Sequence, residues 1–85
     1  MNPEKIQMRN TLALLRRKAA ELREEANGAI PLIRLHLPPY GDDAVLNSDT
    51  EKALSLVKRL HELKKDLVKT LAEIRQLEKE LGEHE

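Results

Sequence analysis

Apolar residues in the C-terminal half of this chain recur at alternating steps of three and four, and no other feature constrains the fold as strongly. The series runs through Ala53, Leu56, Leu60, Leu63, Leu67, Thr70, Ile74, Leu77 and Leu81. Such steps place every member on one face of an α-helix. Val57 and Leu71 lie beside that face and widen it beyond a two-stranded seam. The series therefore predicts a helix over residues 49–81 that packs against more than one neighbour.

The residues at the ends and in the middle of this helix refine the prediction. Ser48 and Glu51 have the spacing of a capping box, in which each side chain accepts from the other's backbone N–H. Gly82 would end the helix in the left-handed conformation. Thr70 is the one polar residue in the series. It either fixes the register or oligomeric state, or is tolerated because its hydroxyl bonds the preceding turn.

A shorter helix is predicted over residues 3–27. Its apolar and small side chains also recur at steps of three and four, at Met8, Leu12, Leu15, Ala19, Leu22 and Ala26. Asn2 is a good N-cap, Pro3 suits the first helical position, and Glu4 interacts favourably with the positive end of the helix dipole. We expect Asn27–Gly28 to end this helix, because glycine adopts the left-handed cap conformation without strain.

Residues 28–48 are expected to form an extended connection. Pro31, Pro38 and Pro39 argue against one continuous helix. Ile33–Leu37 alternates apolar and polar side chains, which is the period of a β-strand. Such a strand would pair with the same segment of a second copy, or would lie as an extended strap over the end of a bundle. A short helical turn beginning at Pro31 is the alternative.

The composition favours long helices packed side by side. The chain is 40% apolar, yet Tyr40 is its one aromatic residue, so burial depends on Leu, Ile, Val and Ala. Two helices that contact only each other would leave part of each stripe exposed. We therefore predict one all-α domain over residues 1–85, an antiparallel coiled-coil-like hairpin that forms a homodimeric four-helix bundle. The predicted oligomer interface comprises Leu12, Leu15, Leu22, Leu56, Leu60, Leu63, Leu67, Thr70, Ile74, Leu77 and Leu81.

The charges suggest one candidate binding surface. Fifteen basic and fifteen acidic residues give no net charge, which argues against nucleic-acid binding through a general positive field. In a hairpin that turns at residues 28–48, however, residues 16–18 would lie level with about residue 60. That arrangement would gather a basic band for an anion or a nucleic acid, made of Arg16, Arg17, Lys18, Lys58, Arg59, Lys64 and Lys65. The alternative is a solvated charged face with local ion pairs.

Metal, cofactor and ligand signals are weak. His36, His61 and His84 have no pair at helical ligand spacing, although His36 would suit a pH-sensitive dimer contact. Turn formation and capping explain the acidic loop, which holds Asp42, Asp43, Asn47 and Asp49, better than calcium binding does. Leu37–Tyr40 is better explained as a rigid turn than as a proline-rich docking ligand. We expect no metal and no cofactor.

These features indicate a small accessory protein without chemistry of its own. The chain has no cysteine, no glycine-rich phosphate loop and no paired nucleophile and base, so we do not expect an enzyme. It also lacks a signal peptide and an apolar run long enough to span a membrane, which favours a complete, cytoplasmic protein. The predicted function is protein interaction or self-assembly through the apolar stripes. Nucleic-acid binding through the basic band is the alternative.

Overall fold

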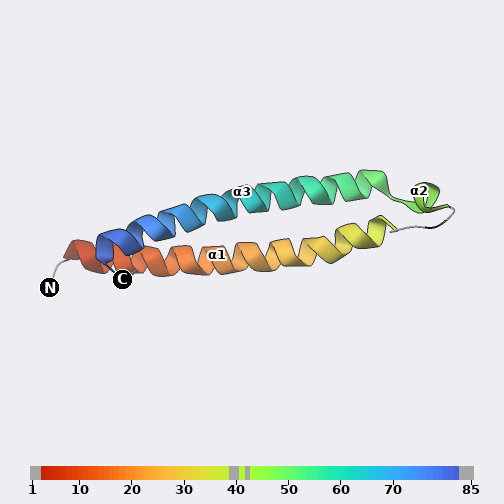
Figure 1. Ribbon diagram of the computed structural model, residues 1–85. Coiled ribbons are helices and arrows are strands. Elements are labelled where there is room, and N and C mark those ends of the chain that lie inside the picture. Colours follow the sequence, from red (N-terminus) through yellow and green to blue (C-terminus); the bar gives the residue numbers. More distant parts are fainter. Residues whose placement is uncertain (1–2, 39–40, 42, 83–85) are drawn as a thin grey trace.

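The computed structural model describes residues 3–38, 41 and 43–82, and these form three helices in chain order. Helix α1 spans Pro3–His36, the short α2 spans Ala44–Asn47, and α3 spans Thr50–Leu81. The two long helices run antiparallel and pack along their length, with α2 at the end where the chain turns back (Figure 1). The resulting hairpin measures 67 × 21 × 14 Å. The all-helical hairpin predicted from the sequence is confirmed for the described residues.

Helix α1 extends well beyond its predicted end at residue 27. The predicted stop at Asn27–Gly28 is wrong, because Gly28 is helical and has no positive φ angle. The apolar period continues past this point, with Ala29 buried and Ile33 half-buried on the same face. Packing of these side chains outweighs the local preference of glycine for a helix end.

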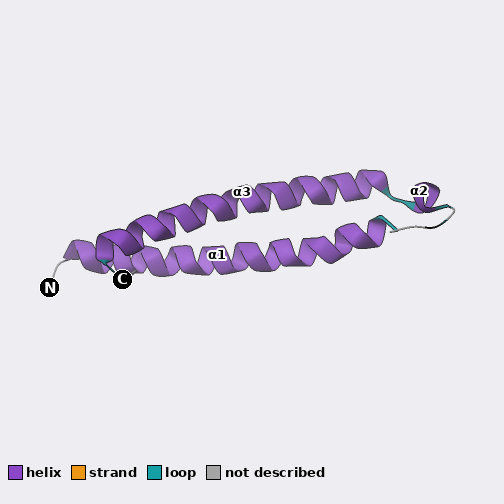
Figure 2. Cartoon of the chain, viewed as in Figure 1, coloured by secondary structure: helices purple, strands orange, loops and turns teal. Residues whose placement is uncertain are grey.

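Pro31 and the segment after it also belong to α1. The predicted interruption at Pro31 is wrong, and Ile33–His36 is helical rather than extended. Proline removes one backbone hydrogen bond and crowds the carbonyl of Asn27, at a cost of about 3 kcal/mol in a helix interior. Burial of the flanking stripe residues offsets part of that cost. The connection between the long helices is therefore shorter than predicted and covers residues 37–49. No strand is present among the described residues (Figure 2).

The start of α3 is capped one residue later than predicted. Asp49 is the N-cap, and its Oδ1 accepts a hydrogen bond of 3.0 Å from the N–H of Lys52. The predicted capping box at Ser48 is wrong, since its hydroxyl donates to the Ala44 carbonyl at 2.6 Å instead. The Asp49 N–H donates to the His36 carbonyl at 2.9 Å, which ties the ends of the two long helices together.

The end of α3 is as predicted. Gly82 has a φ angle of 72° and its N–H donates to the carbonyls of Glu78 and Lys79. The predicted roles of Asn2, Pro39, Tyr40, Asp42 and His84 fall outside the described residues.

The stripes of α1 and α3 meet in one narrow seam. Its buried side chains are Leu12, Ala19 and Ala29 from α1 with Ala53, Leu63, Thr70 and Ile74 from α3. Thr70 is only 1% exposed, and its Oγ1 donates to the Asp66 carbonyl at 2.8 Å. This bond satisfies the hydroxyl within its own helix, which is how a polar residue is accommodated in an apolar seam.

Candidate interaction surfaces

The predicted oligomer interface lies largely inside the chain. Its members Leu12, Leu63, Thr70 and Ile74 are buried between α1 and α3. The other members are half-buried along the edges of the same seam, namely Leu15, Leu22, Leu56, Leu60, Leu67, Leu77 and Leu81. Because the hairpin itself fills the centre of the seam, contact with another chain must add surfaces outside it.

Exposed apolar side chains gather at the end of the hairpin where the chain turns. Ten large apolar side chains are exposed among the described residues, and seven of them lie between residues 32 and 57. We call these seven the apolar tip: Leu32, Leu35, Leu37, Val45, Leu46, Leu54 and Val57. The remaining three, Ile6, Leu14 and Val68, are spread along the two long helices. Clustered apolar exposure of this kind marks interaction sites.

Helix α2 projects the most exposed members of the apolar tip. Val45 is 83% and Leu46 is 84% exposed, and α2 buries none of its residues. Its described backbone hydrogen bonds lie within the connection: the Ala44 N–H donates to the Gly41 carbonyl, the Asn47 N–H to that of Asp43 and the Ser48 N–H to that of Val45. Val45 and Leu46 were not among the interface residues predicted from the sequence. The signal was an apolar Ala44–Leu46 triplet inside a segment that otherwise has turn-forming residues.

The structure does not gather the predicted basic band. Arg59 pairs with Glu25 at 2.6 Å, and one heptad further along both helices Lys18 lies opposite Asp66. Residues 16–18 are therefore level with residues between 66 and 78, not with residue 60, because the hairpin turns later than predicted. Arg16 instead forms an ion pair with Glu78, in which the Arg16 Nη2 donates a hydrogen bond of 2.9 Å to the Glu78 Oε2.

The two ion pairs define two lateral sides of the hairpin. Heptads that begin at Leu12 and Ala53 place Arg16 and Glu78 at e positions, and Glu25 and Arg59 at g positions. In an antiparallel pair of helices, e residues face e residues along one side and g residues face g residues along the other. The e side continues outward through the b positions, and the g side through the c positions.

Charge separates strongly between these sides. The e and b positions of the long helices form the basic side, with Arg9, Arg16, Arg23, Arg34, Lys64 and Arg75, and Glu78 is its one carboxylate among the described residues. The g and c positions form the acidic side, with Glu4, Glu21, Glu25, Glu62, Asp66, Glu73 and Glu80 against Lys18, Lys52, Arg59 and Lys69. A neutral chain therefore carries two faces of opposite sign.

The structure places the seven predicted basic residues on both lateral sides and on the outer backs of the hairpin. Arg16 and Lys64 lie on the basic side, while Lys18 and Arg59 lie on the acidic side. The other three, Arg17, Lys58 and Lys65, occupy f positions on the outer backs of the helices. Nucleic-acid binding through a band of these seven residues thus loses its geometric basis.

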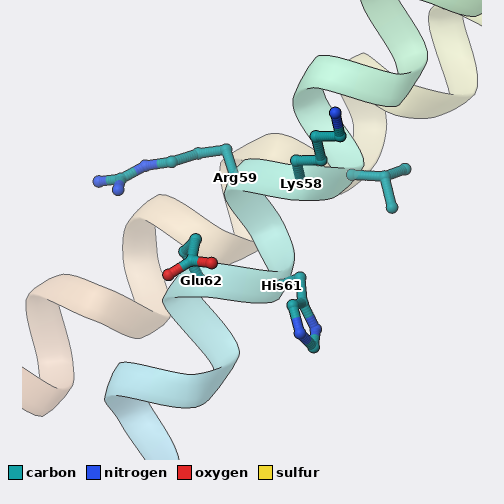
Figure 3. Close-up of a pocket in the computed structure, with 5 residues that line it drawn as sticks. Lys58, Arg59, His61 and Glu62 are labelled. Carbon is teal, nitrogen blue, oxygen red and sulfur yellow. The ribbon is translucent and has the colours of Figure 1, made fainter.

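A shallow hollow on the outer back of α3 has no convergent chemistry. Lys58, Arg59, His61 and Glu62 line it together with Val57, and Figure 3 shows the labelled side chains fanning apart from neighbouring turns. A small-molecule site needs polar groups that point at one place in an enclosed pocket. Among residues 3–38, 41 and 43–82, moreover, no three His, Cys, Asp or Glu side chains are grouped to hold a metal ion.

Within the described part of the chain, neither long helix is apolar enough to cross a lipid bilayer. Comparison with protein-family models, curated proteins and solved structures found no match to this chain.

Proposed function

We propose that this chain is a non-enzymatic self-assembly module, in which copies of the hairpin associate through surfaces that include the apolar tip. The observation that carries the proposal is the clustering of seven exposed large apolar side chains at one end of the hairpin. A solvent-facing cluster of this size is costly for a monomer and is typical of an interface.

The small size of the internal core supports association. Seven described side chains are buried, and three of them are alanines: Ala19, Ala29 and Ala53. A chain this short buries a modest fraction of its surface and is marginally stable by itself. A second copy that covered the half-buried edges of the seam and the apolar tip would bury further apolar surface. Such burial contributes a free energy of about 25 cal/mol per Å².

The proposal is tested by solution mass with tip variants. We expect the wild-type chain to have a mass above that of one 9.7 kDa chain by light scattering. The double variant Val45→Ser, Leu46→Ser should shift the mass toward one chain without loss of helicity, because α2 buries neither residue in the hairpin. Ala72→Ser is the control, since Ala72 is exposed on the outer back of α3 and lies far from the tip.

Two results would contradict the proposal. A helical, monomeric wild-type chain at high concentration would point to a different helical protein as the natural partner. A double variant that associates as strongly as the wild type and the Ala72→Ser control would exclude the apolar tip from the interface.

A further inference from the structure

We infer that copies stack side by side, with the basic side of one hairpin against the acidic side of the next and with all apolar tips at the same end. The inference rests on the proposed self-assembly and specifies its geometry. The partner is a second copy of this chain, because each copy carries both of the complementary faces.

The charges on the two sides have the same spacing. Arg9, Arg16 and Arg23 recur every seven residues along α1 on the basic side. Asp66, Glu73 and Glu80 recur every seven residues along α3 on the acidic side. At 1.5 Å per residue both rows repeat about every 10.5 Å. A shared repeat keeps the two rows in register over their whole length, with Arg16 also paired to Glu78 within its own chain.

The two rows also lie in the same half of the hairpin. The Glu25–Arg59 pair fixes the relative level of the helices, and one heptad step places Asp66 opposite Lys18. A second step places Glu73 opposite Thr11. Taken together with the Arg16–Glu78 pair, this places both rows at the same levels, from the middle of the hairpin to the end remote from the apolar tip. Stacking with the tips aligned keeps the rows at neighbouring levels, whereas reversing one copy would move them apart.

Charge argues against the two-fold alternatives. A two-fold dimer through a lateral side uses the same side of both copies, so it would oppose the basic side to itself or the acidic side to itself. Like charges facing each other across an interface are disfavoured. Contact of the basic side with the acidic side is the complementary arrangement. It joins two different surfaces, so each copy keeps one side free for a further copy and the stack can continue.

Stacking also covers apolar surface. The basic side includes the exposed Leu54, Val57 and Val68, which the next copy would shield from water. Helices in contact have axes about 8–10 Å apart. Successive copies with aligned tips therefore bring Val45 and Leu46 of neighbouring α2 helices close together, along one apolar edge of the stack.

A charge-swap experiment tests this geometry by light scattering. One variant, Arg23→Glu with Lys64→Glu, reverses exposed charges on the basic side. The other, Asp66→Lys with Glu73→Lys, reverses exposed charges on the acidic side. Each variant alone should have a lower mass than the wild type, and an equimolar mixture should regain it, since the altered faces complement each other.

The control variant changes the same number of charges, but at positions that belong to neither the basic side nor the acidic side. Arg17→Glu with Lys58→Glu lies on the outer backs of α1 and α3, and its mass should equal that of the wild type. Circular dichroism checks that all variants remain helical. Raising the salt concentration should lower the wild-type mass, because the contact depends on exposed charges.

The outcomes separate the two proposals. A monomeric wild type overturns self-assembly and the stacking together. A wild type that associates while both charge variants keep its mass, or whose mass does not respond to salt, overturns the stacking alone. Loss of heparin or duplex DNA binding in Arg23→Glu, Lys64→Glu without any change in mass would instead assign the basic side to a polyanion.

Discussion

Gly28 lies inside α1, and its substitution tests whether this helix continues past residue 27. Its φ angle is not positive, and a Cβ atom built at this position meets nothing within 4 Å. Gly28→Ala should therefore increase the free energy of unfolding by about 1 kcal/mol, because alanine is the better helix former and has room. Thermal or urea unfolding followed by circular dichroism measures the effect.

Gly82 provides the contrast for that measurement. Its φ angle of 72° is strained for any side chain, so Gly82→Ala should lower stability. If Gly28→Ala also lowered stability, Gly28 would be acting as a helix cap and α1 would end near residue 27.

At the residue scale, the sequence misleads where a local signal opposes a longer pattern. Gly28 and Pro31 each favour a helix end when considered alone. Ala29 and Ile33 nevertheless continue the three-and-four period across them, and their burial decides the outcome. Thr70 and Gly82 were predictable because their local preferences agree with the helix that surrounds them.

At the element scale, the seam between α1 and α3 holds the hairpin together. Leu63 is 1% exposed, so Leu63→Ala removes buried apolar contacts and should cost about 2–5 kcal/mol. In a chain with so small a core, we expect a large loss of helicity at 25 °C by circular dichroism. Lys65→Ala, on the outer back of the same helix, should change stability by less than about 0.5 kcal/mol. Equal effects from the two substitutions would contradict the observed seam.

The N-terminus of α3 gives a second element-scale prediction. Asp49→Ala should cost about 1 kcal/mol in unfolding free energy, because it removes the acceptor of the Lys52 N–H. Ser48→Ala should cost less, since the Ser48 hydroxyl only bonds within the connection. A larger loss for Ser48→Ala, measured by urea unfolding, would restore Ser48 as the cap.

The heptad pattern was sufficient to predict which faces of the long helices meet. It was not sufficient to predict which residues lie level with each other, because that depends on where the chain turns. Extending α1 to His36 moves Arg16 away from Lys58 and Arg59 and toward the acidic end of α3, where it pairs with Glu78. The predicted basic band is lost through this shift together with the distribution of its residues over different heptad positions.

At the scale of the whole molecule, the hairpin is a thin, neutral rod with opposite charge on its two sides and apolar residues at one end. Neither property could be derived from composition, since both require knowing which heptad positions face which way. The Arg16–Glu78 and Glu25–Arg59 pairs supply that information by marking one side each. Both properties favour association of copies over catalysis or small-molecule binding.

The solution mass of the wild-type chain, measured by light scattering over a range of protein concentrations, tests this account most directly. Self-assembly predicts a mass above 9.7 kDa that rises with concentration. A fully helical chain that keeps a mass of 9.7 kDa at every concentration would contradict it.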